Sequence, residues 1–120
     1  MSTQTVEQLT GKKCAPCEGG VDKYTPEQAR EQLDALEGWE LNDDATMIHK
    51  TWQAKDFLAA IDFVLKTAEA AEREGHHPDV HVTGYRNVRI DLTTHAIGGL
   101  SENDFILAAK IDDLPIQTKQ

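Results

Sequence analysis

The sequence predicts an α+β fold, a two-layer sandwich in which three helices cover one face of a four-stranded antiparallel sheet. Three observations predict it. Apolar residues recur at helical spacing in three segments, four short segments have strand character, and turn residues separate the segments. The resulting order is helix, two strands, helix, two strands, helix, with no internal repeat.

The first helix is predicted to begin at Thr25, whose hydroxyl can cap it. Pro26 suits the first helical position, and Gln28 can reach back as in a capping box. Apolar side chains then fall on one helical face, and Gly38 is expected to end the helix. The apolar positions are Ala29, Leu33 and Leu36.

A hairpin and a long helix are predicted next. Segments 39–41 and 46–52 form the strands, joined across 42–44, where Asn and Asp side chains can bond the turn backbone. The long helix covers 55–74, and Gly75 stops it immediately before a double histidine. Its core-facing residues are predicted to be Phe57, Ile61, Val64, Ala68 and Ala71.

A second hairpin and a last helix complete the predicted domain, which covers 24–115. Apolar residues alternate with polar ones over 80–82 and again over 88–92, on either side of a turn at Gly84. Ser101 can then cap a helix that carries Asp104 in its first turn. Residues 116–120 are expected to be a C-terminal tail.

Residues 1–23 are expected to be a flexible arm, because they contain few large apolar side chains and a Gly-Gly pair. The arm holds both cysteines, Cys14 and Cys17, in a Cys-x-x-Cys motif. A thioredoxin-type motif needs a preceding strand and a following helix, and structural zinc needs two more ligands. We therefore interpret the pair as reduced thiols without an assigned function.

Composition limits the classes of function. At 120 residues and 39% hydrophobic, the chain fits one domain with a modest core. Its net charge of -9 argues against nucleic-acid and anionic-membrane partners. No apolar run approaches the ~20 residues that span a bilayer, and no signal-peptide pattern opens the chain. We expect a cytoplasmic protein.

Three histidines are predicted to meet in one pocket. His76 and His77 precede Pro78, and His95 follows the strand pair that this loop leads into. Imidazole has an unperturbed pKa of ~6.5, so it can give and take protons near neutral pH. Adjacent side chains of extended backbone point apart, so one of the two neighbouring histidines should face the pocket more directly. Pro78 restricts His77 to extended conformations.

The order of residues around these histidines resembles the pterin-4a-carbinolamine dehydratase family, also called 4a-hydroxytetrahydrobiopterin dehydratases. The resemblance covers roughly 24–114 and includes the Gly38-Trp39 pair. The residues that carry it are Glu72, His76-His77-Pro78, Tyr85, Val88, Leu92, Thr94-His95, Gly99-Leu100 and Asp104.

The resemblance implies an enzyme that dehydrates 4a-hydroxytetrahydrobiopterin to quinonoid dihydropterin by histidine acid/base catalysis. This reaction recycles the pterin cofactor of aromatic amino acid hydroxylases, and the family needs no metal or cofactor of its own. The resemblance also implies the fold given above and association into dimers or tetramers through the sheet edge and helices. Open sheet edges are consistent with such pairing.

The resemblance also assigns the site. It places the catalytic histidines at His76, His77 and His95, and these three with Pro78 bind the substrate. In this interpretation His77 and His95 are the acid/base candidates, whereas His76 takes part in pterin binding and proton transfer.

Two acidic residues are predicted to support the site. Glu72 matches the acidic position one turn before the double histidine. Asp104 can orient an imidazole by accepting its second N–H, although it can also simply favour the start of its helix.

Other interpretations remain open from the sequence. Relatives on this scaffold serve as a transcriptional coactivator or as an assembly factor, so a non-catalytic interaction protein is the main alternative. A metal site formed by the histidines is disfavoured, because strand alternation should scatter them over two faces. His49 and His81 are expected to be exposed strand residues. The aromatic side chains of Trp39, Trp52 and Tyr85 can stack on a pterin, but core packing is the more common role.

Overall fold

The computed structural model describes residues 4–14 and 22–118 and confirms the predicted α+β fold. The strands are β1 (Glu40–Leu41), β2 (Ile48–Gln53), β3 (Asp79–Thr83) and β4 (Asn87–Leu92). The helices are α1 (Val6–Thr10), α2 (Pro26–Leu33), α3 (Phe57–Glu74) and α4 (Glu102–Asp112), with a short 3₁₀ turn, η1 (His95–Ile97). No helix in this described part is both long and apolar enough to cross a membrane.

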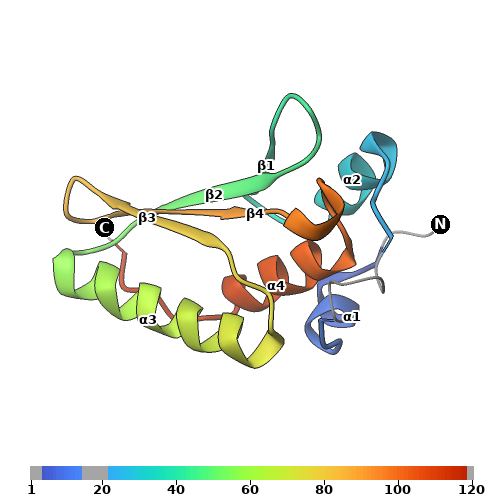
Figure 1. The fold of residues 1–120 in the computed structure, drawn as a ribbon. Coiled ribbons are helices and arrows are strands. Elements are labelled where there is room, and N and C mark those ends of the chain that lie inside the picture. The colour runs from blue at the N-terminus through green and yellow to red at the C-terminus, as the bar shows by residue number, and fades with distance from the viewer. Residues whose placement is uncertain (1–3, 15–21, 119–120) are drawn as a thin grey trace.

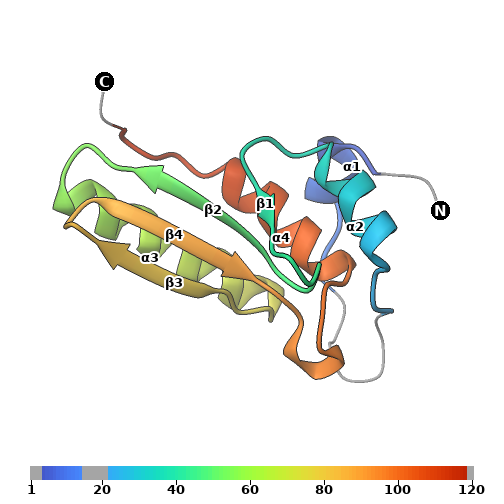
Figure 2. The ribbon, with the colours of Figure 1, turned by 90° about the horizontal axis from the view of Figure 1, so that it is seen from above.

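The four strands form one antiparallel sheet in the order β1-β2-β4-β3. Helices α3 and α4 lie side by side under one face of the sheet, and the other face is open (Figure 1). Helix α2 lies beside β1, at the end of the sheet (Figure 2). Because β3 and β4 are antiparallel neighbours, the start of β3 and the end of β4 lie at the same end of the sheet.

Helix α2 begins as predicted. The Gln28 amide N–H donates to Thr25 Oγ1 at 3.1 Å, and the Thr25 amide N–H donates to Gln28 Oε1 at 2.9 Å, which completes the capping box. The helix ends at Leu33, earlier than predicted, and a turn leads to Gly38, which has a left-handed φ of +82°.

Helix α3 begins two residues later than predicted and ends at Glu74 as predicted, and its buried face is only partly the predicted one. Asp56 caps its start and the left-handed Gly75 ends it. Phe57, Ile61 and Ala68 are exposed, contrary to the prediction, whereas Ala71 is buried and Val64 is partly buried as predicted. Apolar residues occupy more than one face of this helix, so a neighbouring set at helical spacing fills much of the core. The buried residues are Ala60, Phe63, Thr67, Ala70 and Ala71.

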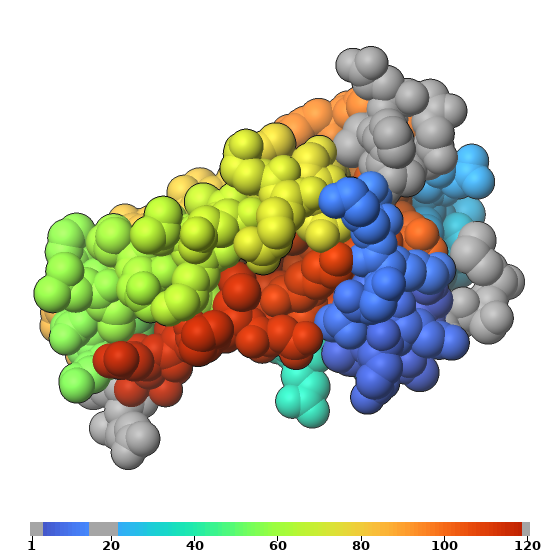
Figure 3. Space-filling view, turned by 90° about the horizontal axis from the view of Figure 1, so that it is seen from below, coloured from blue at the N-terminus to red at the C-terminus, as the bar shows by residue number. Residues whose placement is uncertain are grey.

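Helix α4 is buried nearly all round. The run from 105 to 109 and Ile111 are fully buried. In the helical layer α4 lies between α3 and α1, as Figure 3 shows from below. A helix with so little solvent-exposed surface needs a covering element on every side.

The covering role of α1 corrects the prediction for the N-terminal arm. Within 4–14, Thr5 caps α1 with Gln8 in a capping box, and Leu9 is fully buried in the core that α4 shares. This part is ordered and packed because it covers apolar surface of α4. Cys17 lies outside the described residues. Near the other end, the Lys55 amide N–H donates to the Gln117 carbonyl at 2.7 Å, so residues 116–118 run beside the start of α3.

Candidate active site

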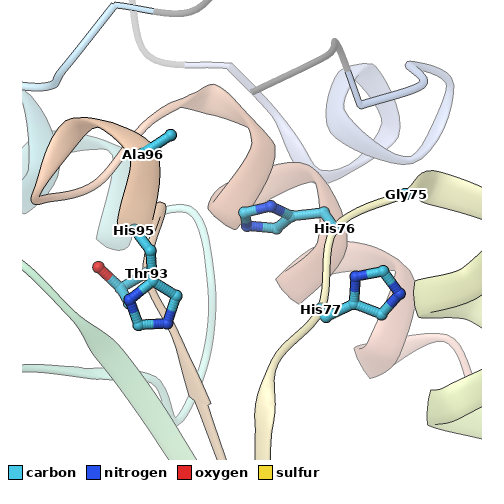
Figure 4. Close-up of a pocket in the computed structure, with 6 residues that line it drawn as sticks. All are labelled: Gly75, His76, His77, Thr93, His95 and Ala96. Atoms are coloured by element: carbon cyan, nitrogen blue, oxygen red, sulfur yellow. The ribbon is translucent and has the colours of Figure 1, made fainter. Parts of the chain in front are cut away.

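The double histidine occupies the short connection between α3 and β3. Gly75 adopts φ +66°, a left-handed conformation that ends the helix and turns the chain. The two rings then diverge, as predicted: His76 is 4% exposed and points into the protein, whereas the His77 side chain is 62% exposed (Figure 4).

His76 is paired with the fully buried Asp104. Its Nε2 lies 2.6 Å from Asp104 Oδ1. A carboxylate can only accept, so the hydrogen in this contact belongs to Nε2 of the imidazole. The pair therefore fixes the orientation of the His76 ring.

The second oxygen of Asp104 is held as firmly as the first. Oδ2 accepts from the Ser101 amide N–H at 2.9 Å and from the Thr94 hydroxyl at 2.8 Å. The Ser101 hydroxyl lies 2.8 Å from that of Thr94, and it caps α4 by accepting from the Asn103 amide. The predicted cap thus has two functions, because it starts α4 and also buries a carboxylate behind His76.

His77 has an acidic neighbour at the protein surface. Its Nε2 lies 2.8 Å from Glu72 Oε1, one helical turn earlier, and both side chains are largely exposed. Solvent weakens an ion pair of this kind. Glu72 therefore orients His77 less rigidly than Asp104 orients His76.

His95 begins η1, directly after the end of β4, and its side chain is exposed. Its imidazole makes no hydrogen bond to another residue within 4–14 or 22–118. The neighbouring Thr93 is anchored, because its hydroxyl donates to the Thr46 carbonyl at 2.6 Å. The backbone just before His95 is therefore anchored, and the His95 ring is available to a ligand.

The three imidazoles line one pocket of about 190 Å³, which confirms that the sequence brings them together. In Figure 4, His77 and His95 lie on opposite sides of the pocket and the His76 ring lies between them. Pro78 does not line the pocket, and Glu72 and Asp104 lie behind the histidines they contact. The six lining residues are Gly75, His76, His77, Thr93, His95 and Ala96.

Chemically, the pocket offers two exposed imidazoles that can exchange protons with a bound molecule, and a third that a buried carboxylate orients. Among residues 4–14 and 22–118, no three His, Cys, Asp or Glu side chains are grouped to hold a metal ion.

Comparison with known proteins identifies the family. Residues 22–114 match the family described as pterin 4 alpha carbinolamine dehydratase. The chain belongs to this family. The Arabidopsis thaliana protein named pterin-4-alpha-carbinolamine dehydratase 2, mitochondrial, is 46% identical over 116 residues. The match covers 94% of this chain but only 62% of that relative, so the chain spans less than two thirds of the relative's length.

Solved structures of pterin dehydratases and related proteins have the same fold. The transcriptional coactivator/pterin dehydratase from Brucella melitensis has a TM-score of 0.71 and 33% identity, over 76% of this chain and 96% of that one. A pterin dehydratase-like protein described as a RuBisCO assembly factor in the alpha-carboxysome has a TM-score of 0.53, over 64% of this chain and 88% of that one. At 23% identity, this second similarity concerns the fold alone.

The remaining histidines of this dehydratase-family chain lie away from the pocket. His81 is exposed on β3, and its Nε2 lies 3.0 Å from Asp91, which also accepts from Arg89 at 2.7 Å. His49 differs from the expectation because it is half-buried, with Glu40 as its acidic neighbour at 3.5 Å.

The aromatic side chains considered for pterin stacking pack elsewhere. Trp39 is buried, and its ring meets Trp52 edge-on at 5.7 Å. Trp52 in turn packs against Phe63 at 4.9 Å. Tyr85 is exposed at the β3–β4 turn. None of these rings lines the histidine pocket.

Thr93 and Ala96 line the pocket and Thr94 donates to Asp104, and none of these three roles was predicted. The only sequence feature that could have indicated these roles is that the three residues flank His95. The hydroxyl contact of Thr94 depends on the approach of α4 to the end of β4, which local sequence does not encode.

Proposed function

We propose that this chain is a dehydratase that converts 4a-hydroxytetrahydrobiopterin to quinonoid dihydropterin and water by histidine acid/base catalysis. The observation that carries the proposal is the convergence of His76, His77 and His95 on one pocket in a member of the dehydratase family. Relatives named for this activity support the substrate class.

The reaction needs one proton donated and one removed. The bond between C4a and its hydroxyl oxygen breaks, the adjacent N5 loses its hydrogen, and a C4a–N5 double bond forms. A protonated imidazole supplies the hydrogen that turns the leaving hydroxyl into water, and a neutral imidazole accepts the N5 hydrogen. The two transfers balance, so no cofactor is consumed.

His77 and His95 are the acid/base pair in this proposal. The two residues line the pocket from opposite sides (Figure 4). In the proposed complex, one imidazole meets the hydroxyl of the bound ring system and the other meets its N5 edge. Both side chains are exposed and can exchange protons with water after each turnover.

His76 binds and orients the pterin in this proposal. Its Nε2–H is committed to Asp104, which fixes the orientation of the ring. His76 therefore has a fixed ring beside the reacting atoms and can stabilise charge that develops on the leaving oxygen.

Stopped-flow absorbance tests the proposed activity. A hydroxylase generates the 4a-hydroxytetrahydropterin in place, and its decay is followed with and without the wild-type chain. We expect the decay to accelerate in proportion to protein concentration. A folded wild-type protein without any effect on the decay would contradict the dehydratase proposal and favour the non-catalytic interaction protein.

We also propose that copies of the chain associate into a dimer or tetramer. Support comes from an apolar α3 surface, defined by the exposed side chains of Phe57, Leu58, Ile61 and Leu65. A cluster of this kind on one helix commonly marks an interface, because water contact with it is unfavourable. The open edge of β3 offers a second possible contact between copies.

The cellular setting belongs to the same proposal. We place the enzyme in the cytoplasm, where it serves an aromatic amino acid hydroxylase by returning its oxidised pterin to the reducible form. The free thiol of Cys14 is consistent with a reducing compartment. Cell fractionation tests the location, since the Arabidopsis relative is named as mitochondrial.

A further inference from the structure

We propose that Glu74 is a positioning residue of this site: its carboxylate joins the N-terminal segment 4–14 and helix α4 to the end of α3, and so holds His76 and His77 in place. The inference deepens the proposed dehydratase function and rests on it for its kinetic consequence. Its structural consequence, the fixed orientation of His76, is independent of activity.

Glu74 is the last residue of α3 and has two partners from different parts of the chain. Its Oε2 accepts from Lys110 Nζ of α4 at 2.8 Å, and its Oε1 accepts from the Cys14 amide N–H at 2.8 Å. The side chain is only 8% exposed. A buried carboxylate with both oxygens bonded is held far more firmly than a surface ion pair such as Glu72 with His77.

The segment 4–14 is bound both to the end of α3, which leads into His76, and to the start of α4, which carries Asp104. At the end of α3, Lys13 Nζ donates to the Arg73 carbonyl at 2.7 Å. At the start of α4, Lys12 Nζ donates to Glu102 at 3.0 Å, and Cys14 Sγ lies 3.5 Å from the Asn103 carbonyl. The segment therefore bridges the residues that lead into His76 and those that lead into Asp104.

Glu74 lies close enough to the histidines in the chain for its contacts to affect their positions. Only Gly75 separates Glu74 from His76, and a Cβ built at Gly75 would meet no heavy atom within 4 Å. Gly75 therefore has no side-chain contacts that could fix the direction of the loop. Two side-chain contacts join this loop to α4: the part-buried Glu74–Lys110 ion pair and the buried His76–Asp104 pair. Loss of the ion pair removes one of these two contacts.

The electrostatics agree with a charged Glu74. Burial alone would raise the pKa of this carboxyl, but hydrogen bonds from Lys110 and the Cys14 amide, with the charges of Lys110 and Lys13, lower it below its ordinary value. Glu74 is therefore ionised at neutral pH, and Lys110 has a full negative charge to pair with.

The substitution Glu74→Gln tests the proposal with almost no change in shape. The amide oxygen can still accept from Cys14, but the NH₂ group meets the ammonium of Lys110, and two donors repel. We expect the imidazole ¹⁵N signals of His76 to shift or broaden, and kcat/KM to fall roughly tenfold, because a small displacement of groups that bind and react with the substrate is costly. Glu69→Gln, on the exposed face of α3, is the matched control and should behave as wild type.

A second pair of variants approaches the same contact from α4. Lys110→Met removes the cation and should reproduce the effect of Glu74→Gln on His76, whereas Lys110→Arg keeps it and should preserve the wild-type signals. If Glu74→Gln does not fold, the two Lys110 variants still show whether the Glu74–Lys110 contact positions His76. Unchanged His76 signals in folded Glu74→Gln and Lys110→Met would overturn the positioning role.

The outcomes separate this inference from the proposed function. If wild-type protein does not accelerate the pterin reaction, the dehydratase proposal fails while the His76 signals still report whether Glu74 holds the loop. If wild type is active and Glu74→Gln keeps both its kcat/KM and its His76 signals, the dehydratase proposal stands and the positioning role is wrong.

Discussion

The Nε2 of His76 lies 2.6 Å from Oδ1 of Asp104, and both side chains are buried. The two residues are 28 positions apart, so this contact joins the α3–β3 connection to the first turn of α4. A short hydrogen bond to a buried carboxylate is strong, and it leaves the His76 ring little freedom. The pocket is therefore built around one rigid imidazole and two exposed ones.

Asp104→Asn should impair catalysis without unfolding the protein. The amide can still accept at Oδ1 from Ser101 and Thr94, but its NH₂ group then faces His76 and forces Nε2 to become an acceptor. We expect kcat to fall roughly 10- to 100-fold, the usual cost of losing such a carboxylate behind a histidine. Asp113→Asn, at the exposed end of α4, is the control. Wild-type activity of Asp104→Asn would show that the pair is structural only.

Gly75→Ala should destabilise the fold through backbone conformation alone. Gly75 has φ +66° and open space where a Cβ would lie, so no clash accompanies the change. We expect a loss of about 1 kcal/mol in the free energy of unfolding, the usual cost of a left-handed residue with a Cβ. Gly75→Asn should lose less, because asparagine tolerates this conformation. Equal losses for both variants, measured by urea denaturation, would contradict the backbone explanation.

Cys14 should resist alkylation in the folded protein at alkaline pH. Burial, with the adjacent negative charge of Glu74, raises the pKa of its thiol from 9.0 to about 12. Because the folded thiol has the higher pKa, its contribution to the free energy of unfolding is fully present below pH 9. That contribution is lost as the pH rises from 9 toward 12. In a Cys17→Ser background, iodoacetamide at pH 9 to 10 should react slowly with native protein and rapidly in denaturant. Rapid labelling of the native protein would show that residues 4–14 do not pack as described.

Leu58→Glu should dissociate any assembly formed through the apolar α3 surface. Leu58 is 79% exposed, so the new charge does not disturb the core of one copy. We expect light scattering to give the mass of a dimer or tetramer for wild type and a smaller mass for the variant. Gln53→Glu adds the same charge at an exposed end of β2 and should keep the wild-type mass. A wild-type monomer would contradict the proposed association.

Local signals allowed much of this structure to be predicted from the sequence. The capping box of Thr25 with Gln28 and the Ser101 cap of α4 act within three residues, and both are present as predicted; the return bond to Asp104, which completes a second capping box, was not predicted. Gly75 ends α3 in a left-handed conformation, which glycine adopts without steric cost wherever it stands in a chain. The convergence of the histidines followed from the antiparallel pairing of β3 with β4.

The errors in the prediction have tertiary causes. Helix α3 has apolar residues on two faces, and only its packing against α4 and the sheet selects the face with Phe63 over the face with Ile61. The short helix α1 has one buried leucine, Leu9, whose burial depends on α4. Glu74 gave no signal in the sequence, because its partners Cys14 and Lys110 are distant in the chain.

The most direct test of the account is stopped-flow measurement of 4a-hydroxytetrahydropterin decay with wild type, His77→Ala, His95→Ala and the control His81→Ala. His81 lies outside the pocket, so its variant should match wild type. We predict that wild type accelerates the decay and that each pocket variant loses about 10²-fold or more of that acceleration, as expected for a lost acid or base. Full acceleration by both pocket variants, or none by folded wild type, would contradict histidine acid/base catalysis in this pocket.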